Sequence, residues 1–148
     1  MNKKKWKDTE RIVQIIEKSI DPESEIFHDQ QLPVLNSTSG RTRQCDVVIR
    51  SGSASRPILT LVEVQDRTSR VKIGEFDGWV EKLKEVGAQR LICVSKQNFP
   101  KSIKEKAALL GGTAMLVKLK SFGEKTPSQF PLIFNVFEPL YTLTSIKI

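Results

Sequence analysis

The chain has 148 residues, 39% hydrophobic and 28% charged, which is the composition of a globular domain and excludes a disordered or fibrous protein. It contains no apolar stretch long enough to span a bilayer, and no apolar region of the secretory type follows its basic start, so we expect a single cytoplasmic domain over residues 1–148. The net charge of +7 favours a polyanionic partner, although proteins that bind no nucleic acid also reach this value.

The first half of the chain predicts a helix followed by extended segments. Isoleucine and valine recur at helical spacing between Thr9 and Ile20, and Asp21-Pro22 ends the pattern. Two extended segments, Glu25 to Leu35 and Gln44 to Arg50, flank a turn-forming stretch and predict an antiparallel hairpin. The run from Ile58 to Gln65 opens with almost no polar residue, which predicts a central strand covered on both faces.

Helices and strands alternate in the second half. A helical pattern runs from Ile73 to Val86 with Gly87 as its stop, and a buried strand follows at Leu91 to Ser95. A helix with Pro100 in its first turn precedes a strand from Thr113 to Leu119. Alternation implies right-handed crossovers and parallel pairing, so we expect an α/β fold with a mixed sheet and a core over about residues 8–119.

Residues 120–148 form an apolar C-terminal extension that is too rich in aromatic groups for a disordered tail. The sequence leaves open whether this extension adds a strand to the sheet edge, covers an exposed face or contacts a second copy of the chain.

Two carboxylates mark the predicted site. A carboxylate in an apolar strand is costly to desolvate unless it is paired or binds a cation, and Asp46 and Glu63 both occupy such positions. Side chains on a strand repeat every second residue, so Gln65 shares the face of Glu63. If the two strands pair, Asp46 and Glu63 can converge on one divalent cation, with the Val64 carbonyl as a further oxygen ligand. A cation held this way can polarise a phosphodiester and activate water.

At these residues the chain resembles the PD-(D/E)xK nuclease superfamily, in its restriction-endonuclease-like, Mrr-like branch. The resemblance rests on the segment from Gly40 to Asp46, followed by Leu61-Val-Glu-Val-Gln65, and on the order of the elements. It implies a three-layer αβα core with a mixed central sheet, Mg²⁺ or Mn²⁺ held by Asp46 and Glu63, and an accessory carboxylate at Glu10. The other interpretation of Glu10 is a solvated helix-face charge, with Glu17 as the substitute carboxylate.

The departure from the family pattern is Gln65. Its position is most often lysine in the family, which orients the attacking water and stabilises developing negative charge, whereas an amide brings no net charge. If the strand persists, Arg67 would share the face of Glu63 and could present its guanidinium to the phosphate; the alternative is a contact with DNA backbone or solvent. The basic residues expected to contact DNA are Arg41, Arg43, Arg67, Arg70 and Lys72.

Other polar and aromatic residues receive structural interpretations. Cys45 and Cys93 lie in apolar strand-like segments and are expected to be reduced and buried. His28, the single histidine, is expected to be a partly exposed strand residue. Phe76 and Trp79 follow the apolar stripe of their helix and are expected to be core residues rather than base-stacking groups.

The sequence therefore predicts a metal-dependent DNA endonuclease that hydrolyses phosphodiester bonds, as a homodimer if it makes double-strand breaks. The first alternative is a nucleic-acid-binding or assembly module on the same fold that has lost turnover, as Gln65 suggests. The second is an α/β domain in which the two carboxylates only form salt bridges with Arg43 or Arg67.

Overall fold

The computed structural model describes residues 10, 11, 13–15, 17, 18, 20–65, 67–120, 132–137 and 142–146, with the backbone alone for residue 120 and the last two ranges. The described residues of the segment 10–20 are helical. The elements that follow are β1 (Glu25–Pro33), β2 (Thr42–Ser53), β3 (Arg56–Gln65), α2 (Ile73–Val86), β4 (Arg90–Ser95), α3 (Lys101–Leu109), a 3₁₀ turn (Gly111–Thr113), β5 (Ala114–Lys120), β6 (Leu132–Phe137) and β7 (Thr142–Ile146).

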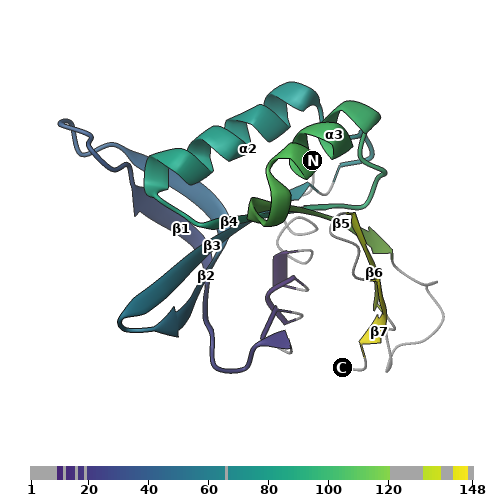
Figure 1. The fold of residues 1–148 in the computed structure, drawn as a ribbon, viewed down its shortest axis with the longest axis horizontal. Coiled ribbons are helices and arrows are strands. Elements are labelled where there is room, and N and C mark those ends of the chain that lie inside the picture. The colour runs from purple at the N-terminus through teal and green to yellow at the C-terminus, as the bar shows by residue number, and fades with distance from the viewer. Residues whose placement is uncertain are drawn as a thin grey trace.

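The strands form one seven-stranded sheet whose spatial order follows the chain (Figure 1). Pairing is antiparallel from β1 to β3, parallel between β3, β4 and β5, and antiparallel from β5 to β7. Both crossovers step in the same direction along the sheet, and right-handed crossovers of this kind place their helices on one face. Figure 1 shows α2 and α3 together on that face and the helical segment 10–20 on the other, so the sheet is the middle of three layers.

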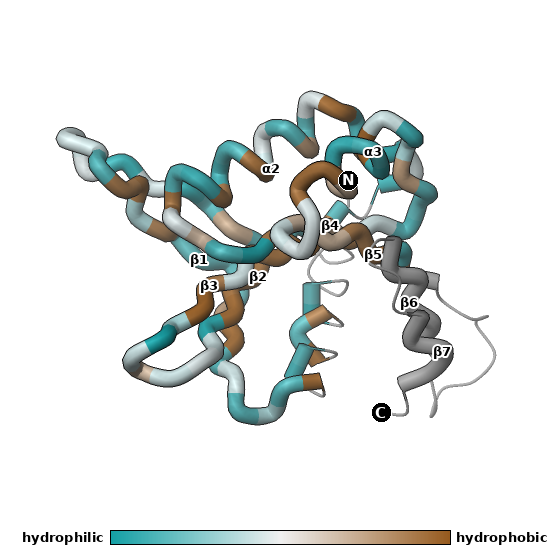
Figure 2. Tube along the Cα trace, viewed as in Figure 1, coloured by the Kyte–Doolittle hydropathy of each residue, from teal (hydrophilic) through white to brown (hydrophobic). Residues whose placement is uncertain are grey.

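Each face of the sheet has its own hydrophobic core. Leu61, Leu91 and Leu116 pack beneath Phe76 of α2 and Ile103 of α3. The opposite face is built largely of valine, and Val13 of the helical segment packs against it. Strand β3 contributes to both cores, which explains its unbroken apolar start. Figure 2 shows hydrophobic residues along the central strands and hydrophilic ones on the outer sides of the helices.

The order of elements, the mixed sheet and the α/β class are as predicted from the sequence, and β3 is a central strand. The bounds of α2 match the prediction, and Gly87 ends the helix in the left-handed conformation with φ 70°. A Cβ atom at Gly87 would lie 2.5 Å from Leu35 Cδ1, so this position favours glycine twice over. Pro100 is the N-cap of α3 rather than a residue of its first turn.

The C-terminal extension adds strands to the sheet, because β6 pairs with β5 and β7 pairs with β6. Its other residues lie outside the described part of the chain. Cys45 and Cys93 are free and buried, as predicted. Within the described residues, no helix has the length and apolar character needed to cross a membrane.

Candidate active site

The predicted site lies where β2 and β3 separate. Their pairing runs from Ser53 and Arg56 to Val47 and Val62 and stops there, whereas β2 continues to pair with β1 as far as Thr42. The separation leaves a cavity of about 540 Å³ between these strands and α2. The residues that line it are Arg43, Asp46, Glu63, Val64, Gln65, Arg67, Glu75, Gly78, Trp79 and Lys82. Asp46 and Glu63, which the sequence predicted to converge, therefore share one cavity.

Asp46 sits at a point where β2 changes face. Cys45 belongs to the core under α2 and α3, whereas Val47 belongs to the core on the opposite face, although residues two apart on a regular strand share a face. The neighbouring residue of β1, Asp29, has a left-handed φ of 56°, and the β1–β2 register omits this pair. The irregularity turns Asp46 out of the regular pleat at the mouth of the cavity.

Beyond the last backbone pair of β2 and β3, the side chain of Asp46 makes the next hydrogen bond between the two strands. Its Oδ2 accepts a hydrogen bond of 2.8 Å from the backbone N–H of Val64. Burial raises the pKa of Asp46 above its ordinary value, and the Val64 N–H and Lys82 act in the opposite direction. The side chain is thus held in place by β3 while one oxygen remains for another ligand.

Glu63 is nearly buried and faces α2. Its Oε1 accepts a hydrogen bond of 2.9 Å from Lys82 Nζ, and the side chains of Glu63 and Lys82 are 4% and 12% exposed. Burial, and next the charge of Asp46, raise the pKa of Glu63 to about 7, and Lys82 partly opposes them. A carboxyl with this pKa is poised between its neutral and ionised forms at physiological pH.

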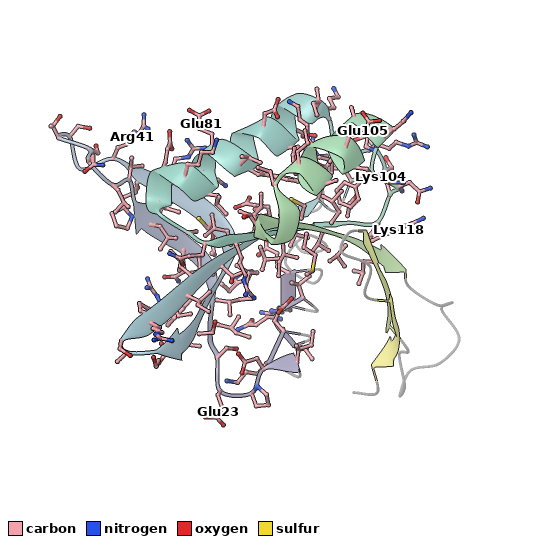
Figure 3. The ribbon with its side chains drawn as sticks, viewed as in Figure 1. Glu23, Arg41, Glu81, Lys104, Glu105 and Lys118 are labelled. Carbon is pink, nitrogen blue, oxygen red and sulfur yellow. The ribbon has the colours of Figure 1, made fainter. Side chains whose placement is uncertain are left out.

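Lys82 is the functional candidate that sequence reasoning missed. It belongs to a stripe on α2 at positions i, i+3, i+4 and i+7, made of Glu75, Gly78, Trp79 and Lys82, and all four residues line the cavity. On the far side of the same helix, Glu81 points away from the sheet (Figure 3). This stripe lies next to the apolar stripe of α2 and ends at Lys82. The spacing is visible in the sequence, and it would have indicated Lys82 once α2 was known to lie over the ends of β2 and β3.

Gln65 lies on the face of Glu63, as the two-residue repeat predicted, and is 3% exposed. Its Nε2 donates a long hydrogen bond of 3.5 Å to the carbonyl of Ser69. Its Oε1 is buried and accepts no hydrogen bond from any described residue. A buried acceptor without a donor is costly, so this oxygen calls for a cation or a water.

The donor set fits a hard divalent cation. Asp46 and Glu63 provide carboxylate oxygens, Val64 lines the same cavity with its backbone, and Gln65 adds an unsatisfied amide oxygen. Among the described residues, no group of three or more His, Cys, Asp or Glu side chains is placed to hold a metal ion. A site with two carboxylates and neutral oxygens suits Mg²⁺, which usually keeps several of its waters.

Glu10 is buried rather than solvated, with 1% of its surface exposed, and contacts the imidazole of His28. Burial is the first cause that raises its pKa, Asp46 is the second, and His28 opposes both. Glu10 does not line the cavity, and it belongs to the helical segment on the face of the sheet opposite α2 and α3 (Figure 1). Glu17, the substitute candidate, lines a separate cavity of about 250 Å³ that includes Thr60 and Arg90, so it takes no part in this site. His28 is partly exposed on β1 as predicted, but its contact with Glu10 was not foreseen.

Three of the predicted arginines pair with residues of α2, and the salt bridges found among the described residues do not join them to the two site carboxylates. Arg41, beside the hairpin in Figure 3, and Arg43 both donate to Glu85, at 2.9 Å and 2.6 Å. Arg67 pairs with Glu75. Salt bridges from Arg43 or Arg67 to the two site carboxylates, the second alternative, are therefore not found among the described residues, and the lysine of α2 pairs with Glu63 instead.

The condition set for Arg67 is not met, because β3 ends at Gln65. Arg67 nevertheless lines the cavity from the bend that follows. Arg70 and Lys72 are exposed on the same connection. Phe76 is a core residue as predicted, whereas Trp79 is only partly buried and lines the cavity, so its assignment to the core was incomplete.

No protein-family model matches the chain, and comparison with curated proteins gives no match. The fold is similar to that of a solved structure described as the crystal structure of a protein of unknown function, AF1548, with a TM-score of 0.53 and 14% sequence identity. The similarity covers 71% of this chain and 54% of that one, so the chain spans about half the length of that protein. At this identity the likeness supports the fold alone.

Proposed function

We propose that this protein is a divalent-metal-dependent DNA endonuclease with a restriction-endonuclease-like core of the PD-(D/E)xK type. The observation that supports this most strongly is Lys82 Nζ, 2.9 Å from Glu63 in the cavity that also contains Asp46. It supplies, from α2, the positive charge that Gln65 lacks on β3. The absence of a lysine at position 65 therefore argues less strongly against turnover, because Lys82 supplies a positive charge in the same cavity.

Each residue has a role that follows from its chemistry. Asp46, Glu63, the Val64 carbonyl and Gln65 Oε1 would hold Mg²⁺ or Mn²⁺, which when bound polarises the phosphodiester and lowers the pKa of a coordinated water. The Lys82 ammonium stabilises negative charge that develops on the phosphate. Glu63 must lose its proton to act as a ligand, and since its pKa is about 7, cation affinity should rise with pH from about 6 to 8.

The test is nicking of supercoiled plasmid in Mg²⁺ or Mn²⁺. Glu63→Ala should abolish nicking, and Lys82→Met should slow it by about 10²- to 10³-fold, the usual loss when a charge-stabilising donor is removed. Lys84→Met is the matched control, because Lys84 lies exposed on the same helix and does not line the cavity. Nicking that persists in Glu63→Ala would refute the site.

The alternative is a DNA-binding or assembly module that has lost turnover. It would be favoured by binding without cleavage on supercoiled, linear and single-stranded DNA, with contacts from Arg41, Arg43, Arg67, Arg70 and Lys72. A cytoplasmic location, and a homodimer if both strands are cut, are further parts of the main proposal.

A further inference from the structure

Trp79 is unusual among the residues of the cavity because it is a large aromatic group beside carboxylates and basic side chains. One part of it packs against the core under α2, and another part lines the cavity. Its neighbours in the lining include Arg43 and Arg67. A cavity wall that combines an aromatic ring with guanidinium groups has the chemistry that proteins use to hold single-stranded nucleic acid, where bases stack on rings and cations follow the phosphates.

The space beside Trp79 is open. Gly78 lines the same cavity, and a Cβ atom built there would meet no atom within 4 Å apart from its two chain neighbours and the backbone of its own helix. The cavity volume of about 540 Å³ falls in the range of sites that enclose a small ligand, so it can admit one nucleotide. A base in duplex DNA is already stacked on both faces and must leave the helix to reach a ring in such a cavity.

We propose that Trp79 stacks on an unpaired base of the nucleic-acid strand bound in this cavity, so that the preferred substrate contains single-stranded or unpaired nucleotides. This inference rests on the proposed function only in taking the ligand to be nucleic acid. Arg43 and Arg67 line the same cavity, and their guanidinium groups, paired with Glu85 and Glu75 in this structure, supply the positive charge for the phosphates of that strand. Since every base has a face that can stack, the contact selects unpaired structure and not sequence.

The direct test uses the fluorescence of Trp79. The chain has two tryptophans, so Trp6→Phe leaves Trp79 as the single tryptophan emitter. Without divalent ions, a single strand of about 12 thymidines should quench this emission, whereas an abasic strand with the same phosphates and a duplex of the same length should quench it much less. Equal quenching by the thymidine strand and the abasic strand would overturn the proposal.

Binding of labelled strands to variants gives an independent test that needs no substitution at Trp6. Trp79→Leu should weaken binding of the thymidine strand by about 5- to 150-fold, leave the abasic strand nearly unaffected, and be largely rescued by Trp79→Phe. Gly78→Leu should block the same space while the residue at position 79 stays tryptophan, and leucine is a better helix former than glycine, so the variant should fold. If Trp79→Leu weakened binding of the thymidine strand and the abasic strand equally, Trp79 would act only through packing and the proposal would be wrong.

These outcomes separate the inference from the nuclease proposal. Plasmid nicking without base-dependent quenching would retain the nuclease and reject the stacking, whereas base-dependent quenching without nicking would retain the stacking and reject the nuclease. A strand of deoxyuridines compared with a strand of uridines, which differ only in the 2′-OH, distinguishes a DNA from an RNA ligand.

Discussion

Replacing Lys82 by methionine should destabilise the protein by an amount that grows with pH. Lys82 is one of the groups that lower the pKa of Glu63, which stands at about 7 against a usual 4.5. A carboxyl whose pKa is raised on folding contributes most to stability at low pH, and this contribution is lost as pH rises from about 4.5 through 7. In the parent protein this loss of stability stops above about pH 7, because Glu63 then ionises beside Lys82.

Without Lys82, burial and Asp46 hold the pKa of Glu63 above 7, and the loss continues to higher pH. Relative to a folded state in which Glu63 stays protonated, ionisation of Glu63 raises the free energy of unfolding of the parent protein by RT ln 2, or about 0.4 kcal/mol, at pH 7 and by about 3 kcal/mol at pH 9. If Glu63 stays protonated in the variant up to pH 9, these are the stabilities that Lys82→Met loses. Unfolded Glu63 is ionised throughout this range in both proteins and cancels.

The measurement is urea unfolding in EDTA at several pH values from about 6 to 9, which gives the free energy of unfolding for parent and variant. Lys84→Met, on the exposed side of α2, controls for the loss of one positive charge. In a Glu63→Gln background the cost of Lys82→Met should no longer depend on pH. A cost for Lys82→Met that is constant across this range would refute the coupling between Lys82 and Glu63.

Three further predictions concern single positions. Asp46→Asn should abolish nicking and remove the rise in melting temperature caused by Mg²⁺. It should cost only about 1 kcal/mol of stability by urea unfolding, because the amide oxygen can still accept a hydrogen bond from the Val64 N–H. A melting temperature that still rises with Mg²⁺ would exclude Asp46 as a ligand. Burial, and next Asp21, raise the pKa of Glu17 to about 7 from 4.5, so its contribution to stability falls by up to about 3 kcal/mol as pH rises between these values. Glu17→Gln should flatten the pH dependence of urea unfolding over this range, and an unchanged slope would contradict the assignment. Gly87→Ala should lower the free energy of unfolding by about 1 to 2 kcal/mol, since alanine is strained at a φ of 70° and its Cβ would meet Leu35. Leu35→Ala should relieve part of that cost. Additive costs of the two substitutions in a double-mutant cycle would argue against the contact.

The fold was predictable because local patterns and topology agree along the chain. Periodicity marked β1 to β5 and α2, and the alternation of helices and strands then indicated parallel pairing in the second half. The same two-residue repeat put Glu63 and Gln65 on one face of β3. These statements need only the chain's own order and spacing.

The missing parts of the site depend on tertiary packing. Lys82 reaches Glu63 across 19 positions of sequence, and the contact exists only because α2 lies over the ends of β2 and β3. The change of face at Asp46 has no glycine or proline beside it to signal a break in the strand. Glu10 could not be distinguished from a solvated helix charge until the helical segment was placed against β1 and His28.

The hairpin between β1 and β2 has a consequence for engineering. Its base is pinned twice, since Val34 N–H donates to the Arg41 carbonyl at 2.9 Å and Leu35 N–H donates to the Glu85 carbonyl of α2 at 2.8 Å. Beyond these anchors the tip from Asn36 to Gly40 is mostly exposed. Residues inserted between Thr38 and Ser39 would extend outward without shifting the sheet, which makes the tip a place to graft a new binding segment while the cavity at the ends of β2 and β3 stays unaltered.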